Sequence, residues 1–163
     1  MTNEDLNRSE LKPDQIAYLL RSGEFTAEEL AESVATGTRG GAWPDLHASQ
    51  EARGLPIDQI VTRLRATIGV RLVAYIGGVG TTSAVAAWAE ARDVPDADKV
   101  TRLRTAFHAL GILLERWDPV TIESWFKGMN PDLGDESPAR VIREAAPDGA
   151  NEVLIAARSA MIN

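Results

Sequence analysis

One glycine-rich stretch of this sequence has residue types that could bind phosphate. It reads Gly77-Gly78-Val79-Gly80-Thr81-Thr82 and follows the apolar run 72–76. A Walker-type loop needs a lysine directly before its serine or threonine, and a dinucleotide-binding fingerprint needs the spacing Gly-x-Gly-x-x-Gly. This stretch has neither, and no alternation of strands and helices surrounds it. We therefore interpret it as a tight turn between two helices.

No other group of side chains forms a recognisable catalytic or metal-binding set. The two histidines, His47 and His108, share no predicted face with an acidic cluster. The chain has no cysteine, which excludes disulfides and thiolate metal sites. Neither a Ser-His-Asp arrangement nor a paired-carboxylate spacing occurs. We therefore expect no enzymatic activity, no metal and no cofactor. An enzyme is the third class that we consider, and nucleotide binding would support it.

The composition is that of a folded protein with unevenly distributed charge. At 163 residues and 44% hydrophobic content, the chain can form a sizeable core. The formal net charge of -7 is divided into -5, +2 and -4 over residues 1–54, 55–116 and 117–163. A positive centre between acidic flanks is compatible with a middle segment that faces nucleic acid. No apolar run is long enough to span a membrane, so we expect a soluble, cytoplasmic protein.

The helices on either side of the glycine turn must position it. Apolar residues recur with helical spacing over 57–68, and Gly69 ends that helix. A second short helix is predicted over 71–76, and a third begins at the threonines. Two short helices joined by a glycine turn are typical of a helix-turn-helix, in which an apolar pair at i and i+3 anchors the second helix. Val85 and Trp88 form that pair.

Two registers compete for this turn. With Gly78 as the turn glycine, the small Ala74 lies where the helices cross, but Ala84 and Ala87 become the anchors. With the valine and tryptophan as anchors, the turn moves by one residue. One additional turn residue would reconcile the two.

The second helix of this motif and its flanks supply the candidate DNA contacts. Its exposed positions hold hydroxyl side chains, without the Arg, Lys, Asn or Gln that make bidentate base contacts. Flanking arginines can contact phosphates. The candidate DNA-binding residues are Arg71, Thr81, Thr82, Ser83 and Arg92. We assign three further basic residues, Lys99, Arg102 and Arg104, to a solvated helix face, with phosphate contacts as the alternative.

Residues 1–55 are expected to form an acidic helical extension that ends in a linker. An apolar stripe and then a capping box at Thr26 predict two short helices before residue 36. The stretch from Thr36 to Gly54 has no helical period and contains several glycines, so we predict the linker there.

A long helix should form the spine of the chain. Its apolar residues recur at spacings of 3 and 4, namely Val100, Leu103, Phe107, Leu110, Leu114 and Trp117. Such a seam is either packed inside the domain or used for dimerisation. Asp118 and Pro119 then open a helix that ends at Gly128. Two more helices are predicted, one over 138–146 and one after residue 149.

The stretch from Trp125 to Pro138 contains two glycines, two prolines and an Asn-Pro. Gly128 suits the end of a helix, and Ser137 followed by Pro138 suits the start of the next. A loop so rich in turn formers is either a rigid connector or a surface presented to a partner.

From about Ile57 onward, the chain resembles the antitoxins called Xre, MbcA and ParS, which join a helix-turn-helix to a C-terminal toxin-binding domain. The matching residues are Val85, Trp88, Pro95, Arg102-Leu103-Arg104, Trp125, Asn130-Pro131, Leu133-Gly134, Pro138 and Val141-Ile142. Where a glycine is expected soon after Leu133-Gly134, this chain has Asp135, Glu136 and Ser137. The structural signature that we assign comprises Val85, Trp88, Trp125, Pro131, Leu133, Gly134 and Pro138.

The resemblance implies an antitoxin of a type II toxin-antitoxin system. Such a protein binds a RES-domain toxin that consumes NAD, occludes the active-site cleft of that toxin, and represses its own operon as a homodimer on operator DNA. We expect the toxin contacts to come from exposed loop residues and the last helix, namely Asn130, Asp132, Asp135, Glu136, Arg158, Met161, Ile162 and Asn163.

The expected fold class is all-α, with three parts. They are the N-terminal helical extension (1–55), a helix-turn-helix bundle (56–116) and a small helical toxin-binding domain (117–163). The alternative function is a stand-alone helix-turn-helix transcriptional regulator whose C-terminal module serves only for dimerisation.

Overall fold

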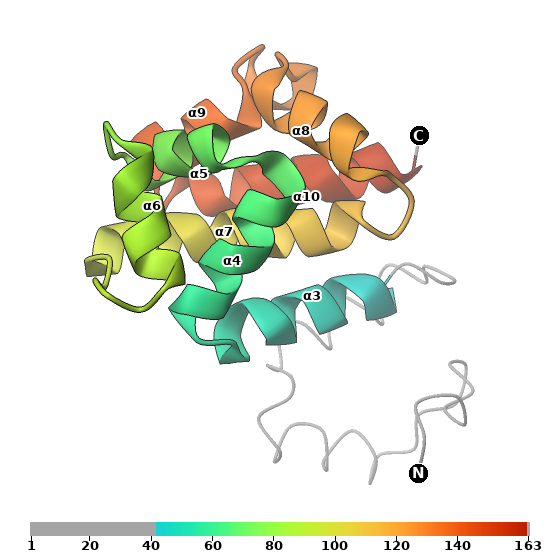
Figure 1. Ribbon diagram of the computed structural model, residues 1–163. Coiled ribbons are helices and arrows are strands. Elements are labelled where there is room, and N and C mark those ends of the chain that lie inside the picture. The colour runs from blue at the N-terminus through green and yellow to red at the C-terminus, as the bar shows by residue number, and fades with distance from the viewer. Residues whose placement is uncertain (1–41, 163) are drawn as a thin grey trace, which may run out of the picture. The chain divides into compact units, whose positions relative to one another are not determined.

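The computed structural model describes residues 42–162, with side chains from residue 45. Within this range the chain is entirely helical, with eight α-helices, one 3-10 helix and no strand, which confirms the predicted all-α class (Figure 1). Residues 43–162 belong to one compact unit. The two helices predicted before residue 36 and the predicted toxin contact Asn163 lie outside the described residues.

The elements follow one another with short connections. In chain order they are α3 (Ala42–Gly54), α4 (Ile57–Ile68), α5 (Val70–Gly77), α6 (Thr82–Ala89), α7 (Ala97–Leu113), α8 (Pro119–Lys127), η1 (Pro131–Leu133), α9 (Pro138–Ala145) and α10 (Gly149–Ile162).

α4 forms where the apolar spacing predicted a helix. It ends at Gly69, whose φ of 85° is unfavourable for residues other than glycine. The buried residues of α4 are Ile60, Val61, Leu64 and Ile68, which is the predicted face without its first member, Ile57. Ile57 is partly buried and packs at the edge of the core.

α7 is buried around most of its circumference. The predicted seam residues Leu103, Phe107 and Leu110 are buried, and four apolar residues outside the seam are buried as well, namely Ala106, Ala109, Ile112 and Leu113. The helix packs against α4, α5, α9 and α10. Leu114 was predicted as part of the seam but is 48% exposed. It lies at the C-cap position, one residue after the end of α7. α7 is therefore the packed centre of the domain.

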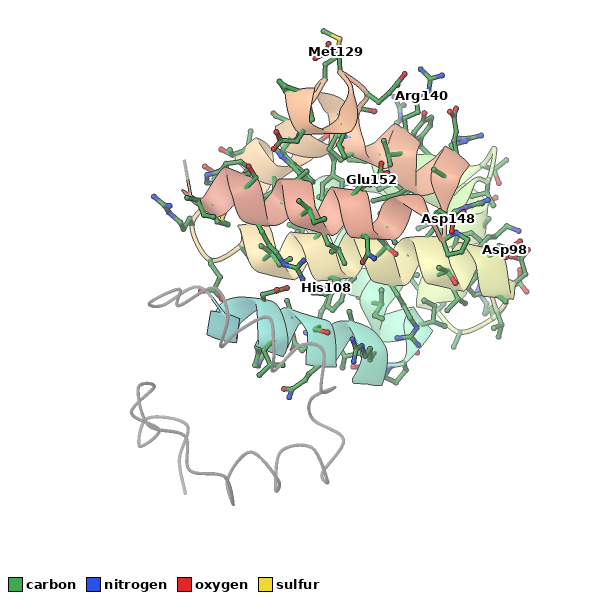
Figure 2. The ribbon with its side chains drawn as sticks, turned by 180° about the vertical axis from the view of Figure 1, so that it is seen from behind. Asp98, His108, Met129, Arg140, Asp148 and Glu152 are labelled. Carbon is green, nitrogen blue, oxygen red and sulfur yellow. The ribbon has the colours of Figure 1, made fainter. Side chains whose placement is uncertain are left out.

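The helices after residue 117 belong to the same core as those before it. α10 lies alongside α7, as Figure 2 shows, and α9 packs against α5. Val153, Ala156 and Ala157 of α10 are buried in a hydrophobic cluster that also contains residues of α4, α5 and α7. The expected division between 56–116 and 117–163 is thus not a division between two cores, because α7 needs helices from both sides to cover it.

Residues 42–54 form a helix, and the predicted linker is wrong in that range. Ala48 and Ala52 are buried. α3 approaches α7 so closely that a Cβ added to Gly111 would lie 2.6 Å from the Cβ of Ala48. A contact made by alanine and glycine produces little hydrophobic periodicity, and the glycines and proline around it suggested a loop.

Polar contacts join α3 to the rest of the domain. Asp45 Oδ1 lies 2.8 Å from His108 Nε2 of α7, and Asp45 Oδ2 accepts a hydrogen bond from Arg158 Nε of α10 at 2.7 Å. Burial raises the pKa of Asp45, but the hydrogen bonds and charges of His108 and Arg158 outweigh burial and hold this pKa below its ordinary value of 3.8.

Two arginines that we assigned to a solvated face instead bond to backbone carbonyls. Arg104 Nη1 donates to the carbonyl oxygens of Ala52 at 2.6 Å and Leu55 at 3.0 Å, at the end of α3. Arg102 Nη1 lies 3.5 Å from the carbonyl oxygen of Gly77 at the end of α5. Both arginines therefore stabilise helix C-termini, where the carbonyls lack partners within the helix.

α5 and α6 are bent by 94° relative to one another and are joined by residues 78–81. Gly78 has φ 75° and ψ 30°, while Val85 and Trp88 are both buried. Both competing registers are thus partly right, since Gly78 is the turn glycine and the valine–tryptophan pair anchors α6. No single helix of residues 42–162 is long and apolar enough to cross a membrane, and α5 and α6 reach that length and composition only together, across the bend.

Replacing Gly78 with alanine should lower the free energy of unfolding by about 1–2 kcal/mol, because a left-handed conformation is unfavourable for an L-residue. The added Cβ would also lie 2.7 Å from Arg102 Nη1. Gly80→Ala in the same turn is the matched control, since Gly80 has open space around it and no positive φ. We expect a change within about 0.5 kcal/mol there. Urea denaturation measures the free energy of unfolding of both variants. If Gly78→Ala and Gly80→Ala lose the same free energy, this account of the turn is contradicted.

Replacing Asp45 with asparagine should destabilise the protein by about 1–3 kcal/mol at neutral pH, because a partly buried charged hydrogen-bond partner is lost. The folded-state pKa of Asp45 is lowered. Its contribution is therefore present above the unfolded pKa and is lost as the pH falls through the folded value. The difference between wild type and Asp45→Asn should shrink below about pH 4 in denaturation measured from acid to neutral pH. A difference that stays constant across this range would refute the role of the Asp45 charge.

Candidate functional site

An open groove beside the α5–α6 turn brings together three of the five predicted DNA contacts. Arg71, Thr81 and Thr82 all line it. The groove has a volume of about 340 Å³. Its other lining residues are Ala74, Tyr75, Val79, Gly80 and Arg143. Arg71 is about ten residues before the two threonines in the sequence. The bend between α5 and α6 therefore places its guanidinium on the same surface as their hydroxyls.

Arg71 lies on the exposed side of α5 and also lines a second open groove, of about 530 Å³, towards α8. Lys127 and Glu123, which line this second groove, form an ion pair with one another. No carboxylate of the described residues pairs with Arg71. Its guanidinium is thus available to an anion that enters either groove.

The start of α6 exposes three hydroxyl side chains. Thr81 is the N-cap residue, but its side chain makes no capping hydrogen bond. Instead, Ser83 Oγ donates to Thr81 Oγ1 at 3.0 Å. The backbone amides in the first turn of α6 therefore receive no side-chain cap within the helix, and amides in this position can bind phosphate oxygens.

Arg92 does not join the other predicted DNA contacts. It follows the end of α6 and does not line the groove. Its Nε donates to Glu90 Oε2 at 2.5 Å, so its charge is already paired. Of the two arginines predicted to flank the second helix, only Arg71 lies beside the start of α6.

Arg143 of α9 is a groove residue that sequence reasoning missed. Its Nη1 donates to the carbonyl oxygen of Tyr75 at 3.1 Å, and its guanidinium carbon lies 4.6 Å from the centre of the Tyr75 ring. The two residues are 68 positions apart, so no local pattern could place them together. The only sequence signal was a basic residue on a short amphipathic helix.

The loop between α8 and α9 is held in one conformation by its own hydrogen bonds. Asn130 Oδ1 accepts from the amide of Asp132 at 3.0 Å, and the amide of Asn130 donates to the carbonyl oxygen of Glu136 at 3.1 Å. Leu133 is buried beneath the loop, whereas Met129 is 81% exposed. Figure 2 shows Met129 at the tip of the loop, pointing away from the helices. The loop is thus a rigid connector that also presents a surface.

The caps on either side of this loop form as predicted. Asp118 Oδ1 accepts from the amide of Thr121 at 2.9 Å, and Ser137 Oγ accepts from the amide of Arg140 at 3.3 Å. Gly128 is the C-cap residue of α8, and its amide donates to the carbonyl oxygen of Ser124 at 2.8 Å. Helix ends were predictable here because caps are local interactions.

The signature residues of the segment 125–138 have clear structural roles. Trp125 packs edge to face on Phe126, with ring centroids 5.1 Å apart and an angle of 82°. Pro131 is exposed at the start of η1, whereas Pro138 is buried at the start of α9. Gly134 and Asp135 both have positive φ, at 64° and 65°. Asp135 therefore has a conformation that favours glycine and that aspartate tolerates better than most residues, which agrees with the glycine expected near this position.

The predicted toxin contacts differ in exposure and in their bonds within the chain. Asp132 and Asp135 are exposed, and Ile162 is 79% exposed. Glu136 pairs with Arg140, with 2.9 Å between Oε2 and Nη1, and Met161 is partly buried against the core.

Two of the predicted contacts also bond within the chain. The Asn130 side chain caps η1, and the Arg158 side chain bonds to Asp45, so each supports the fold. The candidates among the described residues lie in two places, the loop 129–136 and the C-terminal part of α10. The partner of Arg158 lies 113 residues away and could not be read from local sequence.

Comparison with known proteins does not place the chain in a family. No family model, no curated protein and no solved structure matches it.

Proposed function

We propose that the protein is an antitoxin that binds duplex DNA through α5 and α6 and a RES-domain toxin through its C-terminal segment. One observation carries the DNA-binding half. Two short helices, bent by 94° around a glycine turn, expose hydroxyls at the start of the second helix, beside an arginine that pairs with no carboxylate in residues 45–162. Helix-turn-helix motifs have helices at about 90–120°, joined by 3–4 residues.

In this proposal, α6 lies in the major groove with its first turn towards the DNA. Thr81, Thr82 and Ser83 then contact phosphates or thymine methyl groups, and Arg71 contacts the backbone. Because these residues supply no bidentate base contact, phosphate contacts should dominate the affinity, and binding should weaken steeply with salt. A homodimer would raise the affinity by placing two copies of α6 on two half-sites.

The toxin-binding half is supported by the resemblance and by the shape of the loop. The resemblance rests on Trp125, Asn130-Pro131, Leu133-Gly134 and Pro138, residues that hold the loop in one conformation. The segment 117–163 has a net charge of -4, which suits a toxin cleft that is basic because it binds the phosphates of NAD. Met129 and Ile162 are the two most exposed large apolar side chains among the described residues of this segment, and they would anchor the contact.

Deleting α10 is not a valid test of toxin binding. Val153, Ala156 and Ala157 of α10 are buried, so removal of the helix would open the core and unfold more than the contact surface. Surface substitutions are the appropriate test.

The double variant Met129→Glu/Ile162→Glu should weaken co-purification with a RES-domain toxin encoded beside this protein by about tenfold or more, because two apolar anchors become charged. Rescue of growth on co-expression should be lost in parallel. Both side chains are highly exposed, so the fold should be retained. Val94→Glu is the control, since Val94 is 73% exposed in the connection before α7. If the wild-type protein neither rescues growth nor co-purifies with the toxin, the toxin-binding half fails and the stand-alone regulator is favoured.

Arg71→Ala should weaken binding of full-length protein to a labelled duplex of its own promoter region by about tenfold at roughly 0.1 M salt. The slope of log affinity against log salt should fall by about 1 in magnitude. Arg63→Ala removes the same charge from α4, where Arg63 already pairs with Glu51 at 3.2 Å, and should change little. Fluorescence anisotropy measures both variants. Absence of duplex binding by the wild-type protein would reject the DNA-binding half and leave the toxin-binding half to its own test.

A further inference from the structure

We infer that Arg143 of α9 binds the DNA backbone together with Arg71, so that the C-terminal segment is part of the DNA interface. This inference rests on the proposed DNA-binding function. The resemblance assigns the C-terminal segment to the toxin alone, whereas the structure places its Arg143 in the same groove as Arg71, Thr81 and Thr82.

Arg143 is positioned before any ligand arrives. Its guanidinium stacks over the Tyr75 ring at 4.6 Å, and one N–H group donates to the carbonyl oxygen of Tyr75 at 3.1 Å. A guanidinium has five N–H donors in a fixed fork, and this carbonyl is the one hydrogen-bond acceptor that Arg143 contacts among the described residues. The other donors are available to phosphate oxygens. Stacking on Tyr75 also limits the side-chain entropy that would be lost on binding.

The charge of Arg143 is not neutralised by its own helix. Arg140, one turn earlier on α9, pairs with both Glu136 at 2.9 Å and Glu144 at 3.1 Å. Within the described range, neither Arg143 nor Arg71 pairs with a carboxylate. The two guanidiniums line one groove, and neither is neutralised by a carboxylate of the described residues, so this surface favours an anion such as a phosphodiester.

The place of this groove in the motif explains why the anion would be DNA phosphate. The groove lies at the first turn of α6, and that turn approaches the DNA in a helix-turn-helix complex. Thr81 and Thr82 supply two further hydroxyl donors there. Side chains that flank the recognition helix in this way contact phosphates and fix its position on the duplex.

The test uses the full-length protein and compares Arg143→Ala with Arg140→Ala, two changes that remove the same charge from the same helix. Binding to a labelled duplex is measured by fluorescence anisotropy over a salt series. Arg143→Ala should weaken binding by about tenfold and reduce the salt slope by about 1. Arg140→Ala should change the affinity less than about twofold and leave the slope unchanged, because Glu136 and Glu144 already pair with this charge.

Arg143→Lys separates a phosphate contact from a purely structural role. Lysine retains the charge, so the salt slope should match that of the wild type, even though the stack on Tyr75 is lost. If Arg143→Ala lowers the affinity without changing the slope, Arg143 only positions α5 and the inference is overturned. Equal effects of Arg143→Ala and Arg140→Ala would overturn it too.

The experiment also distinguishes this inference from the function on which it rests. If the wild-type protein binds the duplex and Arg143→Ala binds with the same affinity and slope, the inference is wrong while the DNA-binding proposal stands. If the wild type binds no duplex, the proposed function itself fails. Tighter binding to single-stranded RNA or to anionic lipid vesicles than to duplex DNA, lost in Arg143→Ala, would overturn the assignment of the ligand.

Discussion

The burial of α7 is the physical constraint on which the rest of this structure depends. Its apolar residues occur around most of the helix, so no single neighbouring layer could remove them from water. Two helices that precede α7 in the sequence, α4 and α5, pack against it, and so do two helices that follow it, α9 and α10. The segment with α4, α5 and α6 is therefore folded onto the same core as the C-terminal segment, and the two cannot act as independently folded modules.

Because of this shared core, α9 lies between the two candidate binding surfaces. Because α9 packs against α5, it carries Arg143 to Tyr75 and into the groove at the start of α6. The same helix begins at Pro138, directly after the candidate toxin-binding loop and its cap residue Ser137. One helix of eight residues thus connects the two candidate binding surfaces, and both surfaces depend on its position.

Close approach and polar contacts hold α3 to the rest of the domain, in the part of the helix whose side chains the structure describes. Ala48 lies against Gly111 of α7, and Arg104 bonds to the carbonyl oxygens at the end of α3. Asp45 joins α3 to both α7 and α10 through His108 and Arg158. Such contacts depend on geometry more than on hydrophobic area, so they specify where α3 lies. They bury less apolar surface than the contacts of α7 do.

Sequence alone determined what depends on neighbours within one or two turns. The all-helical class, the end of α4 at Gly69, the caps at Asp118 and Ser137, and the anchors Val85 and Trp88 could all be predicted, because helical period, capping and glycine conformation are local properties. Only the tertiary structure decided what depends on distant partners. It showed that α3 is a helix packed on α7 and that Arg158 bonds to Asp45, 113 residues away. It also placed Arg143 beside Tyr75, a contact that no local pattern encodes, because it exists only once α7 has been covered from both sides.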